Sequence, residues 1–182
     1  MSTTLLDLKL DRAFGHLDVN ANGHIEHDDV VALVARLVAG FRETPASPKA
    51  KALAYGFEEF WQSLLVAVDA DADRRLTPEE WNLGMVRAFI DADSGFDRHF
   101  RPAVEAVLRL ADADEDGRLA FAEFQVMQKA FGTRPKDAQE AFDHLDADGD
   151  GALTVEELIT AARRYYTGQG GAAGDWLFGK IG

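Results

Sequence analysis

Acidic and amide side chains alternate with other residues at four places in this chain, and each run is followed by a further acid. In the third run, Asp112, Asp114 and Asp116 stand at alternate positions, and Glu123 follows seven residues later. Carboxylates this close together repel one another unless a cation neutralises them. Carboxylate and carbonyl oxygens are also the ligands that hard divalent cations prefer. The pattern therefore predicts a loop that surrounds such an ion.

All four runs follow one twelve-residue pattern, that of the EF-hand loop. Side chains at positions 1, 3, 5 and 12 and the backbone carbonyl at position 7 bind the ion, while position 6 makes a sharp turn. The runs cover residues 18–29, 69–80, 112–123 and 146–157, and we name them loops one to four. The predicted ligands of Ca²⁺, loop by loop, are Asp18, Asn20, Asn22, His24 and Asp29; Asp69, Asp71, Asp73, Arg75 and Glu80; Asp112, Asp114, Asp116, Arg118 and Glu123; and Asp146, Asp148, Asp150, Ala152 and Glu157.

Loops three and four carry every feature of the pattern. Gly117 and Gly151 stand at position 6, where glycine adopts a positive φ angle without strain. Both loops end in a glutamate, whose carboxylate can give the ion two oxygens. We therefore expect both loops to bind Ca²⁺.

Loop one departs from the pattern at position 12, where Asp29 replaces the usual glutamate. Aspartate is one methylene shorter, so it reaches the ion with one oxygen and favours six-coordinate Mg²⁺. Glu26 at position 9 can offset this loss directly or through a bridging water. We expect loop one to bind Ca²⁺ more weakly or less selectively, with Mg²⁺ as a second candidate ion.

Loop two departs at position 6, where Arg74 replaces the turn glycine. A left-handed conformation costs a non-glycine residue about 1 kcal/mol, and Arg74 and Arg75 bring positive charge close to the ion. Its ligand set is nevertheless complete. The sequence predicts three occupied loops and leaves the occupancy of loop two open.

The segments around the loops have the spacing that helices require. Apolar residues recur every three or four positions before and after each loop, as Leu10, Ala13, Phe14 and Leu17 do before loop one. Thr77 precedes Glu80 by three residues, and Thr154 stands in the same relation to Glu157, which is typical of a helix start. An apolar residue also occupies position 8 of each loop and predicts short strands that pair the loops, namely Ile25, Leu76, Leu119 and Leu153.

The predicted fold is all-α, with four helix–loop–helix units forming two EF-hand pairs in one compact globule. Loop starts are 51, 43 and 34 residues apart. We expect an N-terminal pair in residues 1–92, a C-terminal pair in 93–167 and a glycine-rich tail in 168–182. Residues 41–49 read as a linker and residues 91–95 as the joint between the halves.

Two groups of large apolar side chains are expected to be buried. The helix expected over residues 50–68 needs a large core for its aromatic side chains, which are Tyr55, Phe57, Phe60 and Trp61. The tail carries Trp176, Leu177 and Phe178 after a glycine-rich segment. We expect this apolar tip to dock into the protein's own hydrophobic cleft, where it would compete with a target helix.

Composition excludes several classes of function. The formal net charge of −13 makes nucleic acid an unfavourable partner. The chain has no cysteine, which rules out disulfides, thiolate zinc sites and cysteine nucleophiles. No apolar run reaches the roughly 20 residues of a membrane span, and residues 1–10 lack the pattern of a secretory signal. We therefore expect a cytoplasmic protein without membrane insertion.

The four loops, their unequal spacing and the closing residues 174–179 resemble the sarcoplasmic calcium-binding protein family, and most of all its bacterial members of the calerythrin type. This resemblance extends over nearly the whole chain. It implies a compact single globule with the two pairs packed face to face, and metal buffering or transport as the usual role. Arg74 and Asp29 depart from the family pattern at loops two and one.

Three functions remain as hypotheses. An intracellular Ca²⁺ buffer or transporter leads, because the chain has only three methionines, whereas sensors present a methionine-rich groove. A sensor that regulates a partner protein is the main alternative. A calcium-triggered oxidase like the luminescent photoproteins ranks last, because the candidate polar residues show no site spacing, namely His16, His99, His144, Tyr55 and Trp61. We therefore expect a monomeric protein that is not an enzyme.

Overall fold

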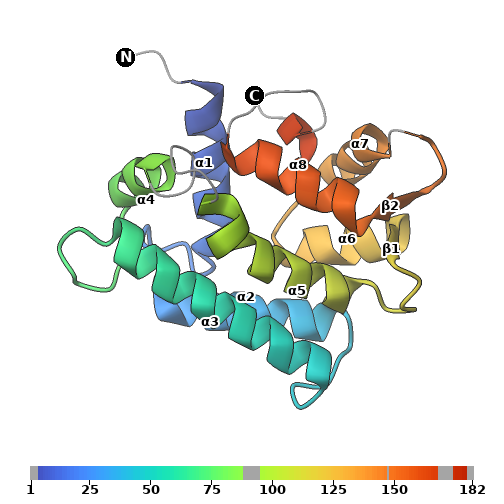
Figure 1. Cartoon of the computed structure of the whole chain (residues 1–182), viewed down its shortest axis with the longest axis horizontal. Coiled ribbons are helices and arrows are strands. Elements are labelled where there is room, and N and C mark those ends of the chain that lie inside the picture. Colours follow the sequence, from blue (N-terminus) through green and yellow to red (C-terminus); the bar gives the residue numbers. More distant parts are fainter. Residues whose placement is uncertain (1–3, 88–94, 147, 168–173, 180–182) are drawn as a thin grey trace.

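The computed structural model describes residues 4–87, 95–146, 148–167 and 174–179, and helices dominate this part of the chain (Figure 1). The named α-helices are α1 (Leu5–Leu17), α2 (His27–Gly40), α3 (Pro48–Val68), α4 (Pro78–Met85), α5 (Arg101–Ala111), α6 (Phe121–Ala130), α7 (Pro135–Leu145) and α8 (Val155–Thr167). Shorter elements are the strands β1 (Arg118–Ala120) and β2 (Ala152–Thr154), the π-helical turn η2 (Phe96–Phe100) and the 3-10 turn η3 (Gly174–Trp176). Each loop lies between two consecutive α-helices, so the predicted all-α fold of four helix–loop–helix units is confirmed.

Helix starts coincide with the ends of the loops. Thr77 caps α4 by accepting a hydrogen bond from the Glu80 N–H, and the Glu80 carboxylate accepts one from the Thr77 N–H in return. Thr154 and Glu157 form the same reciprocal pair at the start of α8. The acid at position 12 of the loop is therefore also part of the cap of the next helix.

One continuous apolar core joins the N-terminal and C-terminal halves. It extends from Leu10 in α1 to Phe178 in the tail. Helix α3 packs along α5, α2 packs against α6 and α1 packs against α8, and Figure 1 shows α3 and α5 side by side. The four loops are thus held on a shared core, as the prediction of one compact globule requires.

Aromatic residues of α3 enter this core, with one exception. Trp61 is fully buried, and Phe57 and Phe60 are each 4% exposed. The expectation that Tyr55 also faces the core is wrong, because its side chain is 70% exposed. The buried face of α3 recurs at three- and four-residue intervals, and Tyr55 lies two residues away from Leu53 and Phe57 on that face.

The connections agree with the predicted linker. Helix α2 ends at Gly40 and α3 begins at Pro48, two residues before the predicted start. The predicted joint at residues 91–95 lies, apart from Gly95, outside the described residues. None of the described helices is both long enough and apolar enough to cross a membrane.

Candidate metal centres

The aspartate at position 1 holds the turn at position 6 in every loop. One of its carboxylate oxygens accepts a hydrogen bond from the position-6 backbone N–H. The N–O distances at position 6 are 2.9 Å for Gly23, 3.1 Å for Arg74, 3.0 Å for Gly117 and 3.0 Å for Gly151. The four loops therefore share one turn despite their different sequences.

Arg74 adopts the backbone conformation of the glycines that it replaces. Its φ angle is +63°, against +87°, +82° and +84° for the glycines at position 6 of the other loops. Position 4 is also left-handed in each loop, with φ between +57° and +70°, at Ala21, Ala72, Glu115 and Gly149. Loop two thus keeps the shape of its relatives at a strain of about 1 kcal/mol at Arg74.

Side chains at positions 3 and 5 are fixed by the backbone two residues further on. In loop three, Asp114 accepts from the Asp116 N–H at 3.3 Å, and Asp116 accepts from the Arg118 N–H at 2.8 Å. Matching bonds occur in the other loops. Each of these bonds uses one oxygen of the side chain, so the second oxygen of a carboxylate stays available for an ion, except in Asp150, whose second oxygen accepts from Arg118.

The acid at position 12 closes the loop onto its own start. Glu123 accepts from the Ala113 N–H at 2.9 Å with one oxygen and from the Ala120 N–H at 3.0 Å with the other. Glu80 does the same in loop two, and the backbone N–H of Thr77 holds the pKa of its carboxyl below the usual value. A lowered pKa keeps this carboxylate charged to lower pH, and a metal ligand must be deprotonated.

Asp29 performs this closure with a shorter side chain. It is buried, and its two oxygens accept from the Asn20 N–H at 3.1 Å and the Glu26 N–H at 3.0 Å. The bond into the loop therefore reaches position 3, whereas Glu80 and Glu123 reach position 2. Loop one also carries amides in place of two carboxylates, so its negative charge is smaller.

Carboxylate oxygens gather in the other three loops. In each, oxygens from three acids lie within 4.8 Å of one another, in the groups Asp69, Asp71 and Asp73; Asp112, Asp114 and Glu123; and Asp146, Asp148 and Asp150. Oxygen Oδ1 of Asp69 is buried and has no hydrogen-bond partner among the described residues. A divalent cation would supply the missing partner and offset the repulsion, so this donor set fits Ca²⁺.

The loops pair as the apolar residues at position 8 predict. Strands β1 and β2 run antiparallel with Leu119 opposite Leu153. In the N-terminal pair, Ile25 and Leu76 exchange two backbone hydrogen bonds of 3.0 and 2.9 Å. All four side chains are fully buried, so both loops of a pair are fastened to the same core.

Three contacts of cations near the loops were not predicted from the sequence. Lys49 of α3 donates to the backbone oxygen of Asp112 at 2.8 Å. Arg75 pairs with Glu26, and Arg118 pairs with Asp150. The sequence predicts that Arg118 gives its backbone carbonyl, and that Arg75 gives its carbonyl and a positive charge near the ion of its own loop. The pairing of the loops could have indicated that both side chains reach the partner loop.

Comparison with known proteins agrees with this geometry. A family model described as an EF-hand domain matches residues 137–168. Calerythrin of Saccharopolyspora erythraea is 25% identical over 170 residues, which cover 93% of this chain and 96% of calerythrin. A sarcoplasmic calcium-binding protein from amphioxus is 18% identical, with a TM-score of 0.78 and coverage of 97% of both chains; at this identity it supports the fold alone.

A solved structure from Streptomyces coelicolor gives a stronger match. This calcium-binding protein, described in the context of prokaryotic calcium-mediated regulation, is 33% identical, has a TM-score of 0.80, and is aligned over 89% of this chain and 98% of its own. The relatives and the four loops agree on one assignment. The chain belongs to the sarcoplasmic type of EF-hand proteins, which includes calerythrin, and is a calcium-binding protein of that type.

Proposed function

We propose that this protein is a calcium buffer whose four loops each bind one ion through the ligands predicted from the sequence. The observation that carries this proposal is the common hydrogen-bonded scaffold of the loops, which fixes the oxygens at positions 1, 3, 5 and 12. Loop two is included because Arg74 keeps the left-handed turn and the bond to Asp69. Loop one remains the candidate for Mg²⁺ binding, because Asp29 is short.

A buffer takes up ions without presenting a new surface to partners, and the tail supports this role. Leu177 and Phe178 are each 6% exposed. The Phe178 ring lies 4.5 Å from the His16 ring and 5.3 Å from the Tyr165 ring, measured between centroids. This packing supports the expected docking of the apolar tip, which would then occupy the place that a target helix of a sensor needs.

Polar contacts anchor the tail to both halves of the molecule. The Gln128 side chain donates to the Leu177 carbonyl at 2.8 Å. Arg12 of α1 donates to the Phe178 carbonyl at 3.0 Å, and Lys9 of α1 lies 2.5 Å from the Asp175 carboxylate. The tail therefore fastens α1 to the C-terminal pair and opposes opening of the cleft.

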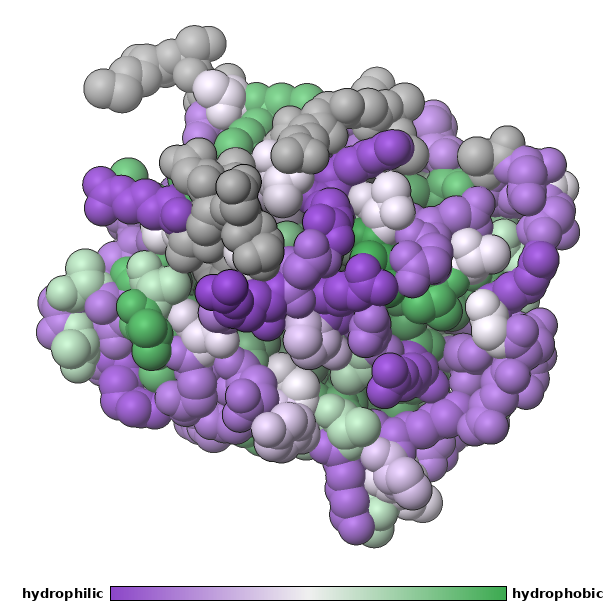
Figure 2. Space-filling view, viewed as in Figure 1, coloured by the Kyte–Doolittle hydropathy of each residue, from purple (hydrophilic) through white to green (hydrophobic). Residues whose placement is uncertain are grey.

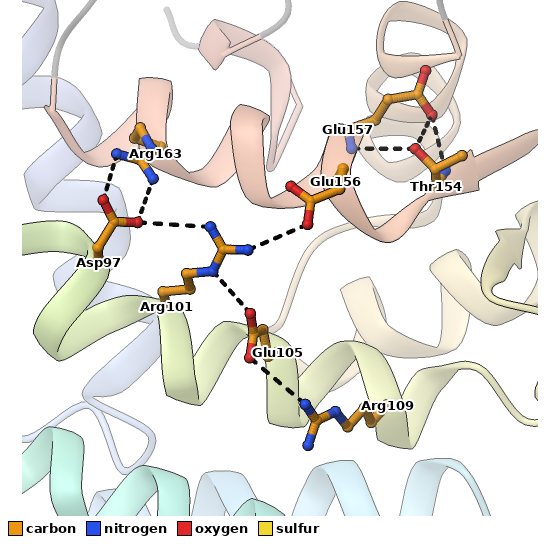
Figure 3. A network of polar contacts seen from close by, with 8 residues as sticks. All are labelled: Asp97, Arg101, Glu105, Arg109, Thr154, Glu156, Glu157 and Arg163. Carbon is orange, nitrogen blue, oxygen red and sulfur yellow. Dashed lines mark hydrogen bonds and ion pairs between the residues drawn. The ribbon is translucent and has the colours of Figure 1, made fainter.

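An ion-pair network also fastens α5 to α8 (Figure 3). Arg101 of α5 bonds Glu105 at 2.8 Å and Glu156 of α8 at 3.2 Å, and lies 3.8 Å from Asp97. Asp97 in turn pairs with Arg163 of α8. Exposed ion pairs contribute about 0–1 kcal/mol each, but several linked around one arginine restrain the two helices more than an isolated pair. This restraint favours a closed C-terminal pair.

The surface and the methionines agree with a closed protein. The face seen in Figure 2 is mostly hydrophilic, with hydrophobic residues in small separate patches. Met85 and Met127 are buried at 0% and 5% exposure, so they belong to the core and not to an adaptable groove. A broad apolar surface, which a sensor would present to its target, is not visible on this face.

Regulation of a partner protein is the second candidate. The Streptomyces coelicolor relative is described in the context of calcium-mediated regulation, and this favours a regulator. In that case calcium would have to open the cleft against the tail and the network of Arg101. The two candidates therefore predict opposite changes of apolar exposure on ion binding.

We also propose that the protein is not an enzyme. Three surface hollows of about 360–420 Å³ have none of the candidate catalytic residues in their lining. A further apolar cavity, of about 70 Å³, lies between α5, α6, α8 and the tail and is well below the roughly 300–1,000 Å³ typical of ligand pockets. None of the candidate catalytic residues lines it, namely His16, His99, His144, Tyr55 and Trp61. A cytoplasmic location, a monomeric state and the boundaries 1–92, 93–167 and 168–182 stay predictions.

Calcium titration with a hydrophobic dye tests the proposed role. A buffer should bind less dye with calcium than with chelator, because ion binding closes and orders the core. A regulator should bind more dye with calcium. An increase in dye fluorescence on adding calcium would therefore contradict the buffer and support the second candidate.

A further inference from the structure

Pairing of the loops places position 7 of one loop opposite position 9 of its partner. In the C-terminal pair, Arg118 of loop three lies opposite Thr154 of loop four. Position 7 gives only its backbone carbonyl to the predicted ion site. Its side chain is therefore free to extend across the pair toward the other loop.

Arg118 extends to a predicted ligand of loop four. Its guanidinium donates to Oδ2 of Asp150 and forms an ion pair with that carboxylate. Oδ1 of Asp150 accepts from the Ala152 N–H at 3.0 Å. Both oxygens of this position-5 ligand thus have partners, and one partner is a cation that belongs to another loop. The hydrogen bond from Arg118 is also the main reason that the pKa of the Asp150 carboxyl is lowered.

The N-terminal pair contains a related contact. Arg75 occupies position 7 of loop two, and its Nε lies 2.8 Å from Oε1 of Glu26, at position 9 of loop one. Here the residue opposite the arginine is itself an acid. In the C-terminal pair the opposite residue is the uncharged Thr154, and Arg118 passes it to reach Asp150. In both pairs a position-7 arginine thus neutralises an acid of the partner loop.

We propose that Arg118 sets the calcium affinity of loop four as an internal counter-cation. This role of Arg118 rests on the proposed function, since it requires loop four to bind an ion. Arg118 stabilises the ion-free loop by neutralising one of its four ligand carboxylates, and it opposes an incoming divalent cation by repulsion. To free Oδ2 of Asp150 for an ion, the guanidinium must move away, so its contact with Asp150 lowers the affinity.

Calorimetric titration of the full-length Arg118→Met variant with calcium tests this role. Methionine removes the charge and keeps most of the side-chain length. We expect the affinity of loop four to rise about five- to tenfold, in proportion to the loss of one nearby partly exposed charge. The melting temperature in chelator should fall, because the ion-free carboxylates lose their counter-cation. Arg118→Lys restores a cation and should return both quantities toward the wild-type values.

Two controls separate this role from a general effect of charge. Arg109→Met makes the same change of net charge at a 73% exposed side chain that pairs with Glu105 on its own helix, and should leave both quantities nearly unchanged. In a Glu157→Gln background, where loop four is disabled, the roughly five- to tenfold rise in affinity caused by Arg118→Met should be lost.

The inference is overturned if Arg118→Met alters the affinity no more than Arg109→Met does. It is also overturned if the effect persists in the Glu157→Gln background. Wild-type protein that binds no ion in loop four would contradict the proposed function as well, whereas normal binding without an affinity change contradicts the role of Arg118 alone.

Discussion

Replacing Asp175 by asparagine should remove the charge that neutralises a buried cation. The Lys9 side chain is 2% exposed and lies 2.5 Å from the Asp175 carboxylate, which is 32% exposed. Lys9 also lies over the Tyr165 ring, 5.5 Å from its centroid. Leaving a buried charge without its partner costs about 3–5 kcal/mol. Because Asp175 is partly exposed, water can replace part of the interaction that its carboxylate makes with Lys9. We therefore expect the free energy of unfolding to fall by about 2–3 kcal/mol.

Replacing Lys9, the other partner of this ion pair, should destabilise the fold much less. Lys9→Met fills nearly the same volume without a charge, and Asp175 can turn to water, so we expect a change below about 1 kcal/mol. The double variant should resemble Lys9→Met alone, because asparagine then leaves no buried charge unpaired. This asymmetry is the signature of a buried ion pair, as opposed to a general effect of the tail.

Thermal unfolding in saturating calcium measures these differences. For a chain of this length, 1 kcal/mol shifts the melting temperature by about 2–4 °C. Asp175→Asn should therefore lower it by about 4–12 °C, and the other two variants by less than about 4 °C. Equal destabilisation by the two single substitutions would refute the reasoning, since the buried lysine would then not depend on Asp175.

Three further changes have defined outcomes. Burial and the nearby Arg12 lower the pKa of His16 from 6.5 to about 4. The neutral form therefore stabilises the fold above pH 6.5, and the free energy of unfolding should fall by about 2 kcal/mol between pH 7 and pH 5. Unfolding experiments should show no such fall in His16→Gln. Arg74→Gly relieves the left-handed strain and removes a cation from loop two. The melting temperature should therefore rise by about 2–4 °C, and the affinity of this loop for calcium should increase. A lower melting temperature or a lower affinity would contradict the assigned strain. Glu157→Gln removes charge and bidentate reach from loop four and, through the pairing of β1 with β2, should weaken loop three as well; unchanged affinities in calorimetry would contradict the coupling.

The loops and their helices were predictable because their pattern is local. Ligand spacing, the apolar residue at position 8 and the caps at Thr77 and Thr154 are set within a few residues, and the structure confirms the strands and caps they predict. Burial of Leu177 and Phe178 was also predictable, since an apolar tip on a polar chain needs a cleft. The prediction failed at Tyr55, which lies off the buried face of α3.

Contacts between distant segments were not predictable. Lys9 reads as an ordinary exposed lysine, and only the docked tail reveals its pairing with Asp175. The contact of Arg118 with Asp150 depends on the register of β1 and β2, in which position 8 faces position 8. The turn at Arg74 was doubtful from the sequence, because the cost of its conformation has to be weighed against the hydrogen bond to Asp69 that only the structure shows.

The number of calcium ions bound per chain at saturation tests the central claim most directly. Equilibrium dialysis of the full-length protein should give four ions, because the four loops share the turn, the carboxylate contacts and the pairing described above. A count of three would indicate that loop two binds no ion although it retains the turn. Recovery of the protein without tightly bound metal in millimolar calcium would contradict the account as a whole.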